Sequence, residues 1–369
     1  MHQNRKLRIV FDIDDTISRV HTKGDYANAE EIWEVTDQIR SLKKQGHTII
    51  LHTARGMVSC GGDAEAARKK NETILKTWLS EHDVPYDEIW WGKPYADLYV
   101  DDKGVSLDDF KAGAIEYMQG FSGAEVVKIG KMVIKTAENA EKQAKWYKET
   151  EERKNVRKWR FNVPEVLSCN FGRLTMNLVE GKKATEIDRR DMWRVTRAVI
   201  DKVLKAFKRE KLEGENDVDW YKAYVGSRAE EIGVDREKAE QDIERTRDLL
   251  KVRTYCHGDL SMSNIIVDGE QITLIDPSQK EVSSWLLDVS KYWASAKGLD
   301  AIIAGKSKKQ WKPDSHTGTM LINWLSPEEC EAALLLERGH WIRVARYAKV
   351  LGKQDVFEKL MEKIREWYG

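Results

Sequence analysis

The chain has 369 residues, with 62 lysines and arginines against 62 aspartates and glutamates. This length suggests two domains, or three, and zero net charge argues against a nucleic-acid coat protein or a supercharged tail. No apolar run approaches the roughly 18 residues of a membrane span. The four cysteines form no CxxC pair, which favours a reducing compartment over a disulfide scaffold. With an N-terminus typical of a strand, not of a signal peptide, we expect a cytoplasmic protein.

Strands and helices are expected to alternate over residues 1–115. This βαβα order predicts a parallel sheet covered by helices. The expected strands are Leu7–Ile13, His47–His52, Glu88–Trp91 and Leu98–Val100. The expected helices are Ala29–Gln45 and a segment capped by Asp63, with Ile74, Leu75, Trp78 and Leu79 on its inward face.

Reactive side chains follow these strands. Asp12 and Asp14 end the first strand, Thr53 follows the second, Lys93 follows EIWWG, and Asp101-Asp102 follows LYV. In an open parallel sheet the carboxyl ends of the strands meet at one rim, where ligands bind. Carboxylates, a hydroxyl and an ammonium group suit phosphoryl transfer through an aspartyl-phosphate, with magnesium neutralising the charge repulsion.

These segments resemble the haloacid dehalogenase superfamily, whose motifs FDIDDT, HTAR, GKP and YVDD match in order over about residues 6–110. The resemblance implies that Asp12 is the nucleophile, that Asp14 is the acid/base, and that Thr53 and Lys93 bind phosphate. The region around HTARGM is similar to a subgroup found with capsular-polysaccharide genes. The short spacing between motifs leaves room for only a minimal cap. The implied magnesium ligands are Asp12, Asp14, Asp101 and Asp102, the last as a further ligand or an outer-shell partner.

Glycines cluster in MQGFSG near residues 117–123, where we place a domain boundary. After it we expect a hairpin over Glu125–Thr136, a charged helix over 137–157, and strands within 166–179. From Asp191, which is expected to cap a helix, the chain is predicted to be mostly helical. A second hairpin is expected over Ile265–Ile275, with Asp268-Gly269 as its turn.

The stretch YCHGDLSMSNIIVDGEQITLIDPS contains the second candidate site. Asn264 precedes one strand of the expected hairpin and Asp276 follows the other, so the two side chains meet at its open end. An amide oxygen and a carboxylate there suit magnesium bound to a nucleotide. Asp259, earlier in the same loop, is placed to orient a substrate hydroxyl and accept its proton.

This stretch resembles the corresponding segment of the aminoglycoside phosphotransferase and choline kinase group. The resemblance to that group covers about residues 119–369. The resemblance implies ATP and magnesium as cofactors, with Asn264 and Asp276 as metal ligands and Leu178–Gly181 near an adenine-binding hinge. Lys135 would bind the α- and β-phosphates. The loop over the phosphates would contain Gly120, Ser122 and Gly123.

The helix partner of Lys135 stays open in the sequence. Glu138, Glu141, Glu149 and Glu151 all compete for this role, and Gln143 is a further candidate for the position. We favour Glu141. Asp288, in SSWLLDVSKYW, is expected to brace the catalytic loop, with substrate binding as the alternative, and His257 is expected to brace it as well.

The resulting fold class is α/β: an N-terminal Rossmann-like haloacid dehalogenase domain with a minimal cap (1–116), then a bilobal α+β protein-kinase-like domain (117–369). Its small lobe spans about 119–182 and its helical lobe about 183–369. We expect a bifunctional phosphatase and ATP-dependent kinase acting on sugars, sugar phosphates or polyols in surface polysaccharide synthesis. Oligomerisation stays open, and membrane and nucleic acid are not expected as partners. The alternatives are a nucleic-acid end-processing enzyme, or a single-activity enzyme with a regulatory second domain.

Overall fold

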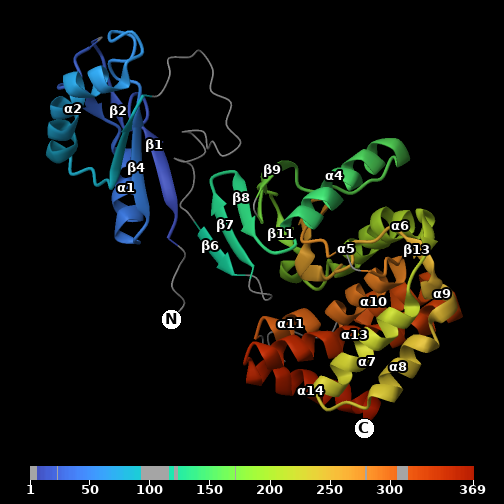
Figure 1. Cartoon of the computed structure of the whole chain (residues 1–369). Coiled ribbons are helices and arrows are strands. Elements are labelled where there is room, and N and C mark those ends of the chain that lie inside the picture. The colour runs from blue at the N-terminus through green and yellow to red at the C-terminus, as the bar shows by residue number, and fades with distance from the viewer. Residues whose placement is uncertain are drawn as a thin grey trace. The chain divides into compact units, whose positions relative to one another are not determined.

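The computed structural model describes residues 6–22, 24–92, 116–119, 124–170, 172–278, 281–305 and 315–369 (Figure 1). The chain divides into two compact units. One contains Met1–Glu116 with Lys128–Lys131, and the other contains Tyr117–Val127 with Met132–Gly369. Within the described ranges, no helix combines the length and the apolar character needed to cross a membrane.

The first unit is built on a parallel sheet, as the alternation of strands and helices predicts. Its described strands lie in the order β1-β4-β5, and Asp12 of β1 is in register with His52 of β4. Asp12 and Thr53 therefore end neighbouring strands at the same edge. The elements are β1 (Arg8–Asp12), β2 (Ser18–Arg19), β3 (Glu30–Glu31), α1 (Trp33–Lys44), β4 (Thr48–Thr53), α2 (Ala64–Glu81) and β5 (Glu88–Trp91).

Helix α1 begins later than the sequence predicts. The expected start was Ala29, but Glu30–Glu31 pairs with Ser18–Arg19 as a short antiparallel ribbon. The backbone N–H of Ile32 then donates to the carbonyl of Ile17, at 3.0 Å. The first turn of the predicted helix is lost because these backbone groups already have partners outside it. The predicted strand Leu98–Val100 lies outside the described residues.

Helix α2 begins as predicted, because the Asp63 carboxylate accepts hydrogen bonds from the N–H groups of Glu65 and Ala66. Leu75, Trp78 and Leu79 are buried, whereas Ile74, predicted on the same face, is exposed. The buried stripe also contains Asn71, so its positions recur every three or four residues and Ile74 lies at its margin.

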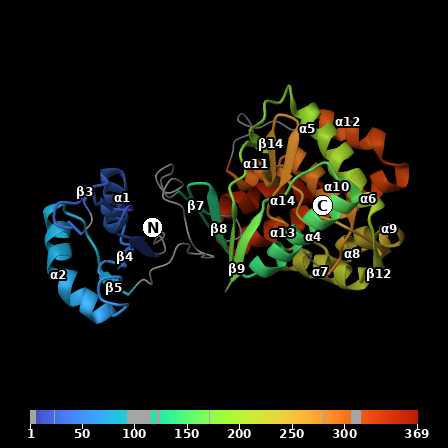
Figure 2. The same cartoon turned by 90° about the horizontal axis from the view of Figure 1, so that it is seen from above.

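The small lobe of the second unit is a sheet with the strand order β6-β7-β8-β10-β9, and β10 runs antiparallel to both neighbours. The predicted hairpin over 125–136 is present as β7 and β8. Helix α4 packs against β9 and β10, and its place beside β9 is visible in Figure 2. The elements are β6 (Glu116–Gln119), β7 (Glu125–Ile129), β8 (Met132–Thr136), α4 (Ala140–Arg157), β9 (Val166–Asn170) and β10 (Arg173–Asn177).

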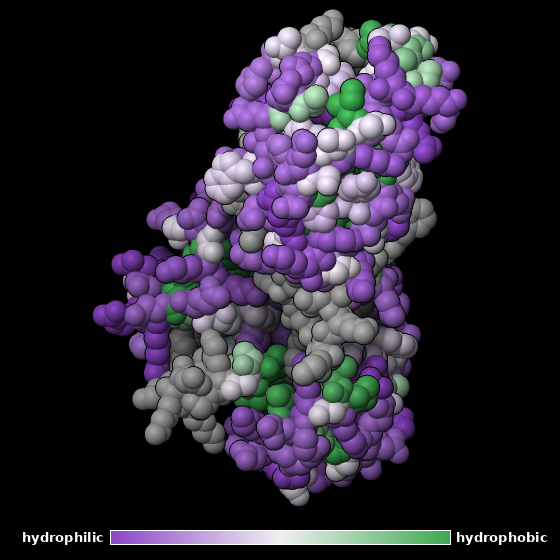
Figure 3. Space-filling model, turned by 90° about the vertical axis from the view of Figure 1, so that its left-hand side faces the viewer, coloured by the Kyte–Doolittle hydropathy of each residue, from purple (hydrophilic) through white to green (hydrophobic). Residues whose placement is uncertain are grey.

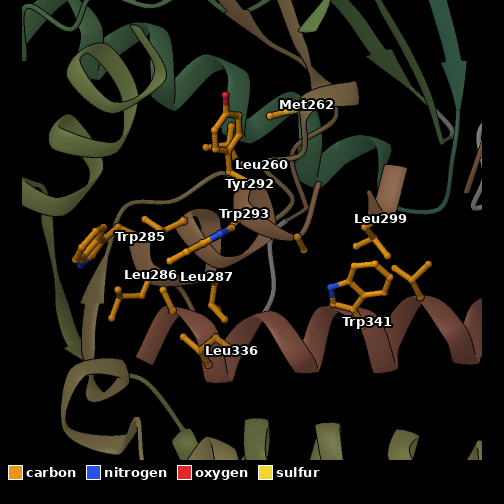
Figure 4. Packing of buried hydrophobic residues seen from close by; sticks show 14 of the residues in the cluster. Leu260, Met262, Trp285, Leu286, Leu287, Tyr292, Trp293, Leu299, Leu336 and Trp341 are labelled. Atoms are coloured by element: carbon orange, nitrogen blue, oxygen red, sulfur yellow. The ribbon is translucent and has the colours of Figure 1, made fainter. Parts of the chain in front are cut away.

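The helical lobe is packed around α10 (Trp285–Ala296), in which every residue is buried. In Figure 4, Trp285, Leu286 and Leu287 of α10 lie above Leu336 of α13 (Pro327–Val350). The remaining helices are α5 (Met192–Ala198), α6 (Lys205–Arg209), α7 (Val218–Glu231), α8 (Arg236–Glu244), α9 (Arg247–Lys251), α11 (Leu299–Ile303), α12 (Ser315–Trp324) and α14 (Gln354–Tyr368).

The prediction that Asp191 caps the first helix of this lobe needs correction. Asp191 precedes α5, but its side chain makes no capping hydrogen bond, and it forms a 3.5 Å ion pair with Arg194 instead. The helix then passes through a π-helical turn (Val199–Leu204) before α6. Val195, Val199, Val203 and Phe207, at spacings of three or four residues, are nevertheless buried.

The hairpin that carries the second candidate site consists of β14 (Ile265–Asp268) and β15 (Gln271–Leu274). Asp268 is in register with Gln271, so the turn is Gly269-Glu270, one residue later than predicted. Gly269 has a φ of 55°, a conformation that glycine adopts without strain. Strand β11 (Lys182–Lys183) extends this sheet beside β14, and β12 (Lys211–Glu215) pairs with β13 (Val252–Thr254) elsewhere in the lobe.

The surface is consistent with the balanced composition. On the face shown in Figure 3, hydrophilic residues predominate and hydrophobic residues appear in separate small groups. Exposed large hydrophobic side chains come from many elements, among them Val10, Trp33, Val156, Trp193 and Val350.

Candidate functional site

Asp288, in the first turn of α10, accepts hydrogen bonds from the backbone of the loop that runs from His257 to Asn264. One carboxylate oxygen of Asp288 accepts from the N–H of His257 at 2.6 Å, and the other from the N–H of Gly258 at 2.8 Å. Asp288 is completely buried, and burial raises its pKa to about 7. These contacts agree with the prediction that Asp288 braces the loop.

His257 links the same loop to the second strand of the hairpin. Its Nε2 lies 2.8 Å from the carbonyl of Ile275, and its Nδ1 accepts from the N–H of Asp259 at 3.3 Å. Burial lowers the pKa of His257 to about 4, so the ring is neutral near pH 7 and Nε2–H is its donor. His257 is therefore a bracing residue, as expected, and has no proton-accepting nitrogen left for a substrate.

Asp259 lies at the centre of the site, with both carboxylate oxygens engaged. Oδ1 accepts from Nη2 of Arg343 at 2.8 Å and lies 3.3 Å from Nζ of Lys291. Oδ2 accepts from Nδ2 of Asn264 at 3.2 Å. Burial raises the pKa of Asp259, but Lys291 and then Arg343 outweigh it, so the pKa lies well below its ordinary range.

Asp276 lies beside Asn264 at the open end of the hairpin, as the sequence predicts. The N–H of Ile275 donates to the backbone carbonyl of Asn264 at 3.0 Å, which brings the two predicted metal ligands together. Asp276 has a φ of 58°, and its N–H donates to the hydroxyl of Tyr147 at 2.9 Å. Tyr147, on α4, thus holds Asp276 in a strained conformation.

Lys135 reaches the site from β8 of the small lobe. Its side chain is nearly buried, and Nζ lies 2.7 Å from Oδ1 of Asp276. The structure therefore brings together Lys135, Asp259, Asn264 and Asp276, four of the residues predicted for the kinase site. Ser122 and Gly123, predicted to contact the phosphates, lie outside the described residues.

Glu141 is not the partner of Lys135, so that prediction is wrong. Glu141 lies in the first turn of α4, and its carboxylate accepts from the N–H of Gly172 at 2.9 Å. Gln143, like Tyr147, is an α4 residue that faces the site, with Nε2 donating to the carbonyl of Pro277 at 3.0 Å. Glu141 and Gln143 differ because positions two apart on a helix point in roughly opposite directions. The other candidates on α4, Glu149 and Glu151, pair with Lys145 and Lys154.

The first unit places Asp12, Asp14 and Thr53 near one edge of its sheet. Nε of Arg55 donates to Asp14 at 2.8 Å, and the N–H of Arg55 donates to the Thr53 hydroxyl at 3.0 Å. Burial raises the pKa of Asp14, and the Asp12 carboxylate adds to this effect. Lys93, Asp101 and Asp102 lie outside the described residues.

Arg55 is the residue of this edge that sequence reasoning missed, although it ends the HTAR motif. It is 1% exposed, donates to Ser18 Oγ at 2.8 Å, and stacks over the ring of Tyr26 at 4.6 Å from its centroid. Its Nη1 is buried and has no hydrogen-bond partner among the described residues. Arg343 and Tyr147 were also missed in the second unit, because no local pattern marks either residue.

The metal predictions rest on oxygen donors in both units. Asn264 uses its amide nitrogen on Asp259, so its side-chain oxygen is the atom able to coordinate a cation. With the Asp276 carboxylate this is a hard-oxygen pair that suits magnesium. In the part of the chain that the structure describes, no three His, Cys, Asp or Glu side chains gather to hold a metal ion.

Part of the helical lobe, including the loop from His257 to Asn264, matches a known family model. Residues 223–284, which include Asp259, Asn264 and Asp276, match the family model of the RIO domain. No curated protein matches the sequence.

Several solved structures are similar to this chain. An aminoglycoside phosphotransferase, APH(2″)-IIIa in complex with GDP and kanamycin, is 12% identical with a TM-score of 0.47, covering 70% of this chain and 94% of that one. The choline kinase LicA from Streptococcus pneumoniae is 14% identical with a TM-score of 0.48, over 70% of this chain and 94% of that one. A structural-genomics target from Vibrio cholerae, whose name states no activity, is 32% identical with a TM-score of 0.28, over 29% of this chain and 89% of that one.

Proposed function

We propose that the second unit transfers the γ-phosphate of ATP to a hydroxyl group of a small molecule. The observation that carries this proposal is the convergence of Asp259, Asn264 and Asp276 with Lys135, which comes from a different lobe of the same unit. Each side chain has a distinct use in phosphoryl transfer, and a packed structural core does not require this combination. The similarity of the region around HTARGM to a subgroup found with capsular-polysaccharide genes motivates sugars, sugar phosphates or polyols as acceptors.

Asp259 orients the acceptor hydroxyl and accepts its proton. Lys135, held nearly buried between the lobes of the unit, binds the α- and β-phosphates of ATP. Asn264 and Asp276 would hold magnesium, which neutralises the charge of the phosphates when it is bound. Asp288 and His257 keep the loop in place by hydrogen bonds, so that Asp259 needs little reorganisation when the substrates bind.

We also propose a phosphatase activity for the first unit, on the basis of the four motifs and the strand-end geometry. Asp12 attacks the phosphorus of a phosphate ester, and Asp14 protonates the leaving oxygen as the ester bond breaks. The raised pKa of Asp14 favours the protonated form that this step needs. Asp14 then accepts a proton from the water that hydrolyses the aspartyl-phosphate, while Thr53 binds phosphoryl oxygens and Arg55 fixes Asp14.

A place in the synthesis of surface-polysaccharide precursors is the role that the sequence of the first unit suggests. The kinase would install a phosphate at one position of a sugar or polyol, and the phosphatase would remove one from another. A nucleotidyltransferase would then be the class of enzyme that activates the product.

Phosphorus NMR of the full chain with ATP, magnesium and a pool of sugars and sugar phosphates tests both activities. A new phosphoester signal together with ADP supports the kinase, and free phosphate released while ATP stays intact supports the phosphatase. Asp259→Asn should abolish the first signal alone, and Asp12→Asn the second alone. If either substitution removes both signals, two independent sites are the wrong description.

A further inference from the structure

Two cations, Arg343 of α13 and Lys291 of α10, lie against the proposed catalytic base. Both contact the same oxygen of Asp259, Oδ1, at 2.8 and 3.3 Å. Both side chains are nearly buried, with 12% and 4% of their surface exposed. In the described ranges, Asp259 is the only acid that forms an ion pair with either of them. Two positive charges therefore meet one negative charge.

The surrounding groups do not balance this excess. Burial lowers the pKa of His257 to about 4 and of His340 to about 3, so both rings are neutral near pH 7. Tyr221, close to Arg343, is also neutral, because burial raises its pKa far above its ordinary value. Both oxygens of Asp288 accept from backbone N–H groups of the loop, and in the described ranges Asp288 forms no ion pair with Arg343 or Lys291. A buried excess charge is costly unless a ligand supplies the opposite charge.

The two oxygens of Asp259 face different parts of the unit. Oδ2 contacts Asn264, which lies beside Asp276 and hence on the side of Lys135 and the nucleotide. Oδ1 faces α10 and α13 through Lys291 and Arg343. A base that takes a proton during the transfer lies between donor and acceptor. The acceptor is therefore expected on the side of the two cations.

We propose, relying on the kinase activity proposed above, that the acceptor carries an anionic group, a phosphate or a carboxylate, which Arg343 and Lys291 bind. Arginine matches the geometry of both anions through paired N–H donors. An acceptor anion competes with Oδ1 of Asp259 for these N–H donors. The interactions of Arg343 and Lys291 with Oδ1 therefore weaken when the acceptor binds. Oδ1 then accepts the hydroxyl proton as the new oxygen–phosphorus bond forms and the bond to ADP breaks.

Matched acceptors test this inference. ADP formation by the full chain is measured with sets of compounds that share one ring, namely a neutral sugar, its uronate and its 6-phosphate. An anionic acceptor should have a kcat/KM about ten- to a hundredfold above the neutral sugar, the range expected for hydrogen bonds to a charged group. Arg343→Gln should remove this preference by raising KM for the acceptor, with KM for ATP unchanged.

Arg346→Gln is the matched control on the same helix. Arg346 pairs with Glu231 on α7 at 2.8 Å and is not part of the site, so the preference should stay. Inorganic sulfate should compete with the acceptor in the unaltered protein, which keeps the inference testable if Arg343→Gln does not fold.

Three results would overturn the inference. The first is equal use of neutral and anionic acceptors. The second is an Arg343→Gln protein with a higher KM for ATP and an equal loss of turnover on every acceptor, because the cations would then bind the transferred phosphoryl group. The third is ATP turnover that is unaffected by Asp259→Asn, which rejects the kinase proposal itself and this inference with it.

Discussion

Nζ of Lys135 and Oδ1 of Asp276 are 2.7 Å apart, although 141 positions separate them in the sequence. Lys135 comes from the sheet of the small lobe, and Asp276 follows the hairpin of the helical lobe. This ion pair connects the lobes of the second unit at the position where a nucleotide is proposed to bind. When a nucleotide and magnesium are bound, Lys135 would bind the phosphates and Asp276 would bind the magnesium ion.

Lys135→Met tests the nucleotide role of this pair. The substitution removes the ammonium group that is proposed to bind the phosphates, so KM for ATP should rise about tenfold or more. Lys131→Met, in the turn between β7 and β8, is the control, because Lys131 is exposed. Steady-state ADP formation measures both variants. An unchanged KM for ATP in Lys135→Met would remove Lys135 from the proposed site.

Gly258→Ala should damage both stability and transfer. Gly258 has a φ of 78°, and an added Cβ would lie 1.9 Å from the carbonyl oxygen of Ser278. Because this neighbour is backbone, the loop from His257 to Asn264 must shift. Gly233→Ala is a close control, since Gly233 has a φ of 79° and open space around it. Thermal unfolding should show a loss of about 1 kcal/mol for the control and a larger loss for Gly258→Ala. Equal losses would contradict this account.

Asp288→Asn should change how stability depends on pH. A carboxyl group whose pKa is raised to about 7 by folding contributes stability that is present at low pH and declines as pH rises from its unfolded value toward 7. Asparagine does not titrate, so the free-energy difference between the two proteins should be larger near pH 5 than near pH 8. Denaturant unfolding at both pH values measures this difference, and a difference that grows with pH would contradict the prediction.

Arg55→Met should act on the phosphatase alone. It removes the 2.8 Å hydrogen bond and the positive charge that lower the pKa of Asp14, so this pKa should rise further. Phosphate release should fall at least tenfold and its pH optimum should move upward, while ADP formation by the second unit is retained. Arg68→Gln, on the exposed surface of α2, is the control. A similar loss in both variants would show that the effect is only structural.

Local sequence patterns predicted much of each unit. The N-cap at Asp63 and the hairpin that joins Asn264 to Asp276 depend on residues close together in the chain. The partner of Lys135 was predicted wrongly, because several acids on α4 have similar sequence neighbourhoods. Which residues of α4 face the site depends on how the helix is rotated against the sheet, and packing turns Gln143 and Tyr147 toward the site instead of these acids.

The sequence by itself determined that a carboxylate, an amide and a second carboxylate occur around one tight hairpin, because short loops leave the backbone few alternatives. Only the tertiary structure decided what surrounds Asp259. Arg343 lies 84 positions away on a helix whose buried face is set by the core of the helical lobe. A charged side chain on such a helix carries no local signal for its partner, since that partner is chosen when the helices pack together.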